Sequence, residues 1–469
     1  MNPRLFRISA TSMGLFLALA LLSPVGQAIA AKAPRHTNLA NAKLGLFVHY
    51  VFGLTQAAPG RPPLKNVNEF ANDLNVKGIA DMASAMGAQY VIFTAYHWRM
   101  TMLFPCPFWR SAFPNHDSSR DVIKALAKAL TLRGIKLVLY IHPDDRHDFS
   151  RARLDKLIKL GWSSRRTLKK CLLHSYPQFE PYDRKWNRFF YRLLGYMGRL
   201  FGNQIAGYWI DDGDAAANGV KVRNIICHYT PHAAIWANGF KKSAPATLIG
   251  GENWSLFDHN PKPHLYNTTA AQTAVVIAGS WWASGGAKYA PGSMAQGSGA
   301  GAVALRHSGR LQFTPAEMYR YLVCTIGTKG QHNGGVVYAT SPFSDNHWEA
   351  GVPAGLAALG KLIKARAQSI YNTVPSRAYV SGDAAAQKPK WGVAVDSMDG
   401  KTVYLHILIP PKGRSLQIGK PADHVTFSGA HLLNGRSLRI DNNRRGYTLI
   451  LPPETKWNPV DTVIALTVK

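Results

Sequence analysis

Residues 207–214 read GYWIDDGD, an apolar run that ends in three closely spaced carboxylates. Tyr, Trp and Ile favour extended backbone, so the run predicts a strand buried on both faces. Acids crowded at the end of such a strand repel one another, bind a metal or carry out chemistry. The rest of the chain bears on this choice, because the stretch is one copy of a recurring pattern.

The pattern is a short apolar run with a polar or aromatic end, followed in several copies by a helical stretch such as 119–134. Continuous apolar runs of this length predict strands of a parallel sheet. They lie at 44–50, 89–97, 135–143, 205–212, 233–239, 246–253, 273–282 and 334–342. Eight such strands predict a (β/α)8 TIM-like barrel. Ser118 or Ser119 is expected to cap the helix at 119–134, and Gly134 to end it.

Near residue 373 the pattern changes to apolar and polar residues in alternation, interrupted by turns. KTVYLHILIPP (401–411) and GYTLILPP (446–453) are two examples. Alternation with period two predicts an antiparallel β-sandwich. We therefore expect a barrel domain over 31–372 and a sandwich domain over 373–469.

The first thirty residues have the form of a secretory signal peptide. Two arginines precede an apolar run, which is interrupted by Pro24 and ends in Ala28-Ile29-Ala30, a small-x-small cleavage pattern. The run is short for a membrane span. We expect a periplasmic or secreted protein with signal peptide 1–30 and no membrane span after cleavage.

The charge balance is strongly basic, with 55 Lys and Arg against 26 Asp and Glu. Such a balance attracts polyanions. For an exported chain, acidic or sulfated polysaccharides fit better than nucleic acid. The alternative is that the basic residues are spread over a solvated surface, since no block of like charges marks a binding tail.

No motif predicts a metal or a cofactor. HPDDRHD (142–148) offers His and Asp ligands, but Arg146 lies among them, and a solvated loop is the preferred interpretation. The Gly-rich stretch 285–302 has no Walker or dinucleotide spacing. The four cysteines form no CxxC pair, so disulfide pairing stays open and free buried thiols are the simpler expectation.

In a barrel of this kind the active site lies at the C-terminal ends of the strands. The side chains there are His49, His97, His142, Asp211, Asp212, Asn238, Glu252, Trp281 and Trp282. Two acids and aromatic platforms suit glycoside hydrolysis, in which one carboxylate attacks or activates water and the other protonates the leaving oxygen. Asp211 and Glu252 are the candidate pair. Apolar neighbours such as Trp254 would keep Glu252 protonated, as a general acid requires.

Three stretches resemble the α-L-fucosidases of glycoside hydrolase family 29: KLGLFVHYVFG (43–53), GAQYVIFTAYHW (87–98) and GYWIDDG (207–213). The resemblance implies that His49 and His97 bind sugar hydroxyls and that Asp211 is the nucleophile. SIYNT (369–373) and NPVDTVIALTVK (458–469) are similar to the family's domain junction and last strand. A retaining mechanism on a fucosylated oligosaccharide or glycoconjugate, without metal or cofactor, is what the family implies.

The chain departs from the family pattern at three places. Trp98 replaces the second histidine of a pair, with Arg99-Met100 in place of Asp-Gly, and Asp212 replaces a glycine beside the nucleophile. The acid/base residue lies on a variable loop, so Glu252 is chosen and Asp258 is held in reserve.

The other expected contacts are with the sugar. Trp98, His142 and Trp281 are expected to shape the pocket, although Trp281 also fits a barrel core. Two functions remain open: an exported retaining α-L-fucosidase, or a non-catalytic or re-specialised carbohydrate-binding protein for another α-L-sugar or a sulfated glycan.

Overall fold

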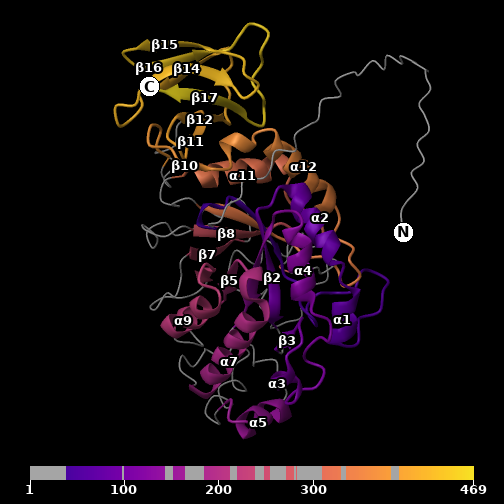
Figure 1. Ribbon diagram of the computed structural model, residues 1–469. Coiled ribbons are helices and arrows are strands. Elements are labelled where there is room, and N and C mark those ends of the chain that lie inside the picture. The colour runs from indigo at the N-terminus through magenta and orange to yellow at the C-terminus, as the bar shows by residue number, and fades with distance from the viewer. Residues whose placement is uncertain are drawn as a thin grey trace, which may run out of the picture. The chain divides into compact units, whose positions relative to one another are not determined.

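The computed structural model (Figure 1) describes residues 39–97, 100–142, 151–163, 184–211, 219–237, 248–253, 271–278, 281, 309–328, 334–381 and 390–469. The predicted signal peptide lies outside these ranges. Among the described helices none is long and apolar enough to pass through a membrane. Cys106, Cys227 and Cys324 are free thiols.

Eight parallel strands close into a barrel. They are β1 (Leu44–Val48), β2 (Tyr90–His97), β4 (Lys136–Ile141), β5 (Gly207–Ile210), β6 (Ala234–Ala237), β7 (Leu248–Asn253), β8 (Ala271–Val276) and β9 (Gly335–Ala339). Each strand pairs with its neighbour in chain order, and β1 pairs with both β2 and β9. The predicted barrel is therefore confirmed; seven of its eight strands lie within a predicted run, and β8 begins two residues before the run predicted at 273–282. The short strand β3 (Thr101–Met102) extends β2 in the antiparallel sense.

Helices lie between the strands wherever the connections are described. They are α1 (Val67–Asp73), α2 (Val76–Met86), α3 (Pro107–Arg110), α4 (Val122–Thr131), α5 (Arg151–Lys159), α7 (Arg184–Phe201), α9 (Gly219–Tyr229), α11 (Pro315–Gly327) and α12 (Val352–Lys364). The predicted serine cap of α4 is wrong. Asp121 is the cap and accepts a bond from the Lys124 N–H, because the helix begins later than the serines. Gly134 does follow the helix end with a positive φ of 71°.

The alternation of side chains along the strands separates two cores. Residues at every second position fill the barrel interior, among them Phe47, Ile92, Val138, Tyr140, Trp209, Trp236, Ala274 and Val337. The residues between them, such as Leu46, Leu139 and Ile210, face the surrounding helices. This is the packing expected of a barrel filled by its own side chains.

One irregularity in β2 changes which residues face inward. The register with β4 shifts between Thr94 and Tyr96, which inserts an additional residue into β2. Beyond such a bulge the alternation changes face. As a result Thr94 and His97, three residues apart, both face the barrel interior.

The antiparallel strands form two sheets. One has the order β10 (Thr373–Pro375), β11 (Gly392–Ser397), β12 (Thr402–Ile407), β17 (Thr462–Val468), β14 (Phe427–Leu432), and the other the order β13 (Ser415–Gly419), β16 (Gly446–Ile450), β15 (Arg439–Asn443). A shared apolar core with Leu405, Leu449 and Ile464 lies between them, so the predicted sandwich is confirmed. His36–Lys469 form one compact unit, and a domain division at residue 373 stays a prediction.

A buried polar network joins the barrel helices to the sandwich. The Asp461 carboxylate accepts a 2.6 Å bond from the Tyr319 hydroxyl of α11 and lies 2.7 Å from His406 Nδ1 of β12. Arg366 donates to the Asp461 carbonyl at 2.9 Å. Burial beside this carboxylate raises the pKa of Tyr319, so its hydroxyl stays a donor.

Candidate active site

Interior-facing polar side chains gather where the barrel strands end. Along β1, β4 and β5, the position two residues beyond an interior aromatic residue is polar: His49 follows Phe47, His142 follows Tyr140, and Asp211 follows Trp209. Because side chains alternate along a strand, these residues face the same side as the aromatic residues below them. His97 joins them through the bulge in β2.

Asp211 is the carboxylate of this cluster. Its N–H donates to the Ile141 carbonyl at 3.1 Å, which continues the β4–β5 ladder one residue past β5. The Tyr140 hydroxyl donates to Asp211 Oδ2 at 2.6 Å, and the side chains are buried. The short bond between a phenol and a carboxylate fixes the orientation of the carboxylate.

Three histidines form a wall beside Asp211 and Tyr140. His49 Nδ1 lies 2.7 Å from the Thr94 hydroxyl, and its ring meets Tyr140 edge-on with centroids 4.7 Å apart. His97 lies 5.1 Å from His49 and stacks in parallel on His142 at 4.9 Å. All three imidazoles are buried, so their orientations are set by packing as well as by hydrogen bonds.

Trp281 closes one side of the cluster. Its ring lies 5.6 Å from Phe47 and 6.3 Å from His49. It is buried at the edge of the interior core. Trp281 therefore both fills the barrel and borders the histidine wall, so the two interpretations of this residue are compatible.

A cavity of about 460 Å³ lies among the segments that follow β1 and β9. Arg61, Asp345, His347 and Trp348 line it. Asp345 pairs with His347 at 3.1 Å and with Arg61 at 3.7 Å. Since segments after barrel strands surround the active-site end, the cavity lies toward that end of the barrel, but none of the clustered site residues lines it.

The structure brings five of the predicted site residues together: Asp211, His49, His97, His142 and Trp281. The backbone of Glu252 lies in β7, in register with the interior residue Ala274, but its side chain lies outside the described part of the chain. Trp98, Asp212 and Asp258 also lie outside it. The catalytic and binding roles of all these residues stay predictions.

Two residues of the cluster were not predicted: Tyr140 and Thr94. A signal for Tyr140 was present, since it lies two residues before His142 and so shares its face. Thr94 had no comparable signal because the bulge hides its relation to His97. No group of three or more His, Cys, Asp or Glu side chains suited to a metal occurs in the ranges the structure describes.

A closed parallel barrel with acid, imidazole and aromatic groups at its strand ends, followed by a β-sandwich, defines the architecture, and it offers the groups that glycoside hydrolysis requires. The family model described as Alpha-L-fucosidase matches residues 67–198, a segment that includes His97, Tyr140 and His142. None of the curated proteins matches the chain in sequence.

Solved structures of α-L-fucosidases share the fold. The enzyme from Bacteroides thetaiotaomicron has a TM-score of 0.65 at 16% identity, over 93% of this chain and 95% of that one. A trapped covalent intermediate of a fucosidase from the same organism gives 0.64 at 16% identity, over 93% and 96%. Isoenzyme 1 from Paenibacillus thiaminolyticus gives 0.60 at 18% identity, over 93% and 99%. The resemblance is thus confirmed at two levels: the chain shares the fold of solved α-L-fucosidases, and its segment 67–198 matches their family model.

Proposed function

We propose that the protein is an exported retaining α-L-fucosidase that acts on fucosylated glycans, with Asp211 as nucleophile. The observation that carries this proposal is the buried Asp211 carboxylate, held by Tyr140 beside the three-histidine wall at the active-site end of the barrel. The family match and the shared fold supply the choice of sugar.

The chemistry takes place in two displacements. In the first, Asp211 attacks the anomeric carbon while Glu252 protonates the departing oxygen, which leaves a covalent glycosyl–enzyme ester. In the second, Glu252 deprotonates a water that displaces Asp211 and releases the sugar with its original anomeric configuration. The covalent intermediate trapped in the Bacteroides enzyme supports this course.

The surrounding side chains bind and orient the sugar. His49 and His97 offer ring nitrogens to sugar hydroxyls, and Trp281, His142 and Trp98 shape the pocket. Tyr140 acts through Asp211, since its hydroxyl fixes the attacking carboxylate before substrate arrives.

Turnover of an aryl α-L-fucoside tests the proposal. We expect hydrolysis with retention by NMR, labelling of the Asp211 peptide by 2-fluoro-fucosyl fluoride, and loss of at least about three orders of magnitude in Asp211→Ala. The exposed Glu454→Ala variant is the control and should retain activity. If the wild type shows no turnover and Asp211→Ala is indistinguishable from it, the proposal of a fucosidase is refuted.

The second candidate is a carbohydrate-binding protein of the same fold that is non-catalytic or specific for another α-L-sugar or a sulfated glycan. The sequence departures at Trp98, Arg99 and Asp212 favour it. Saturable binding across a panel of α-L-glycosides without hydrolysis would support this function instead.

Two rescue experiments choose between Glu252 and Asp258 as acid/base. Fluoride can leave a fucosyl fluoride without being protonated by the enzyme. The variant that lacks the acid should therefore still cleave a fucosyl fluoride but fail to cleave natural glycosidic linkages. External azide should then restore turnover in that variant alone.

Export is proposed on the N-terminal sequence. Protein recovered from expressing cells should begin close to Ala31 and lie outside the cytoplasm. An intact Met1 in the purified cytoplasmic fraction would contradict export without affecting the catalytic proposal.

A further inference from the structure

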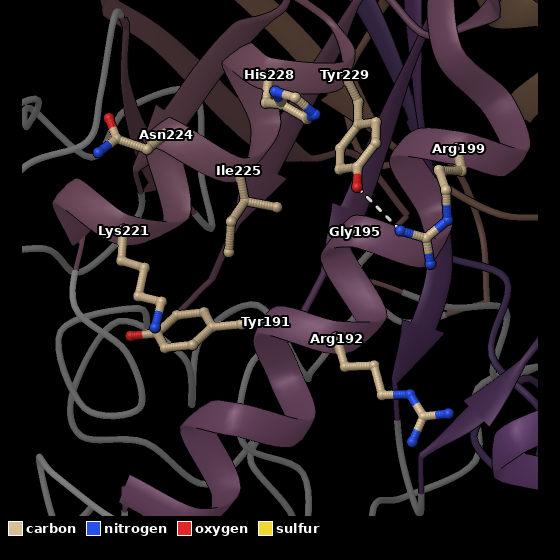
Figure 2. A pocket seen from close by; sticks show the side chains of 9 residues that line it. All are labelled: Tyr191, Arg192, Gly195, Arg199, Lys221, Asn224, Ile225, His228 and Tyr229. Atoms are coloured by element: carbon tan, nitrogen blue, oxygen red, sulfur yellow. Dashed lines mark hydrogen bonds between the residues drawn. The ribbon is translucent and has the colours of Figure 1, made fainter.

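A groove on the outer helices of the barrel is basic and aromatic. It has a volume of about 510 Å³ and lies between α7 and α9, which pack against each other. Its lining residues are Tyr191, Arg192, Gly195, Arg199, Lys221, Asn224, Ile225, His228 and Tyr229 (Figure 2). We call this set the α7–α9 groove. Its volume is within the range of roughly 300–1,000 Å³ that ligand pockets have.

Helical periodicity explains why these side chains meet. Tyr191, Gly195 and Arg199 recur every four residues along α7, and Lys221, Ile225 and Tyr229 do so along α9. Residues four apart share one helix face. The opposite face of α7, with Phe190, Leu193 and Met197, is buried in the apolar core between the barrel strands and the helices.

Aromatic rings hold the cations of the groove in place. The Lys221 ammonium lies 4.6 Å from the Tyr191 ring centroid, and the Arg199 guanidinium lies 5.6 Å from that of Tyr229. Arg199 also donates to the Tyr229 hydroxyl at 2.9 Å, as Figure 2 shows. A ring attracts a cation without neutralising it. These contacts therefore orient the positive charge of Lys221 and Arg199.

Glycine lets the two helices approach closely enough to form the groove. A Cβ at Gly198 would lie 2.6 Å from Tyr229, so only glycine allows the Tyr229 side chain to pack directly on α7. Gly195 lines the groove itself, and Figure 2 shows Ile225 lying between the two cation–aromatic pairs. The tyrosine rings are thereby fixed at opposite ends of the groove.

Charge on the two helices is of one sign. The sequence of α7 contains five Lys or Arg residues and that of α9 two, and neither contains Asp or Glu. Within the described residues, Arg192 and Arg199 form no ion pair with a carboxylate; Arg192 instead lies over the Phe108 ring at 4.5 Å. The groove therefore has a positive potential that its own side chains do not cancel.

We propose that the α7–α9 groove binds an anionic polysaccharide through its sulfate or carboxylate groups. Guanidinium and ammonium groups recognise such anions, Tyr191 offers an apolar ring to a sugar, and Asn224 and His228 offer hydrogen bonds to hydroxyls. The choice of a glycan over other polyanions rests on the proposed function. The groove lies on the outer helices, whereas Asp211 faces the barrel interior, so binding here is separable from catalysis.

Matched charge reversals test the proposal in the Asp211→Ala background, which keeps binding independent of turnover. The groove variant is Arg192→Glu with Lys221→Glu. The control is Arg188→Glu with Arg223→Glu, which changes the net charge equally at exposed positions of the same helices outside the groove. Heparin oligosaccharides probe sulfate, oligogalacturonate probes carboxylate, dextran is the neutral glycan, and single-stranded DNA is the polyanion without sugar specificity.

We expect the groove variant to bind at least one anionic glycan about tenfold or more weakly than the control, with affinity that falls as salt rises. Dextran should not bind. Equal weakening by the two variants would overturn the groove as the site. DNA binding that depends on the groove as strongly as glycan binding does would overturn the assignment to a glycan. Neither outcome bears on the fucosidase activity proposed for Asp211, which is measured separately.

Discussion

Replacing Tyr140 with Phe removes one oxygen atom from the barrel interior and leaves the ring in place against His49. The lost bond is the 2.6 Å contact with Asp211 Oδ2, made between buried side chains. A hydrogen bond to a charged group contributes about 1.5–3 kcal/mol. Because the bond orients the nucleophile rather than the sugar, we expect that energy to be lost in the transition state. It corresponds to a decrease of about 10- to 150-fold in kcat/KM, mostly in kcat.

Steady-state hydrolysis of an aryl α-L-fucoside measures this decrease. Tyr208→Phe is the matched control, since Tyr208 is buried on β5 but packs in the core outside the barrel. It should leave kcat and KM unchanged. If Tyr140→Phe instead retains wild-type kcat/KM, or raises KM alone, the hydrogen bond does not position the nucleophile and the reasoning fails.

Three further predictions concern stability. Burial lowers the pKa of Lys43 from 10.5 to about 7, so below pH 7 folding buries an ammonium at a cost of about 5 kcal/mol, which disappears as pH rises toward 10.5. In urea unfolding, Lys43→Met should therefore gain stability over the exposed control Lys136→Met at about pH 6 and much less at about pH 10; an equal gain at both would contradict this. Asp461→Ala should lose about 3–5 kcal/mol, because it leaves the buried network without its acceptor; a loss below about 1 kcal/mol refutes that role. A Cβ at Gly360 of α12 would overlap the carbonyl oxygen of Ala85 in α2. Gly360→Ala should therefore lower the melting temperature by an amount equivalent to about 1–3 kcal/mol. A higher melting temperature in this variant would show that the helices can separate freely.

The barrel could be predicted because its strands are buried on both faces. A run such as Val91–Phe93 or Leu137–Leu139 has no polar position, which is the composition of a strand between a filled interior and a helix layer. The sandwich could also be predicted, since strands such as β12 and β16 alternate buried and less buried side chains over part of their length. Helix boundaries were less certain: the serines before α4 and Asp121 are all good caps, and packing decides among them.

The site could be predicted only where chemistry and position coincided. His49, His142 and Asp211 are polar residues directly after apolar runs, and the structure brings them together. Tyr140 was not predicted because a tyrosine inside a strand is as typical of an apolar core as of a functional site. The α7–α9 groove could not be predicted from spacing, since it depends on how closely two helices approach each other.

The bulge in β2 makes the histidine wall depend on the register of a strand and not only on the identity of its residues. With the same residues in plain alternation, Tyr96 would turn into the barrel and His97 would turn toward the helices. Deletion of Ala95 would instead remove the additional residue and leave His97 on the interior face. Every histidine is present in all three forms, so a comparison of residue types alone would not distinguish them.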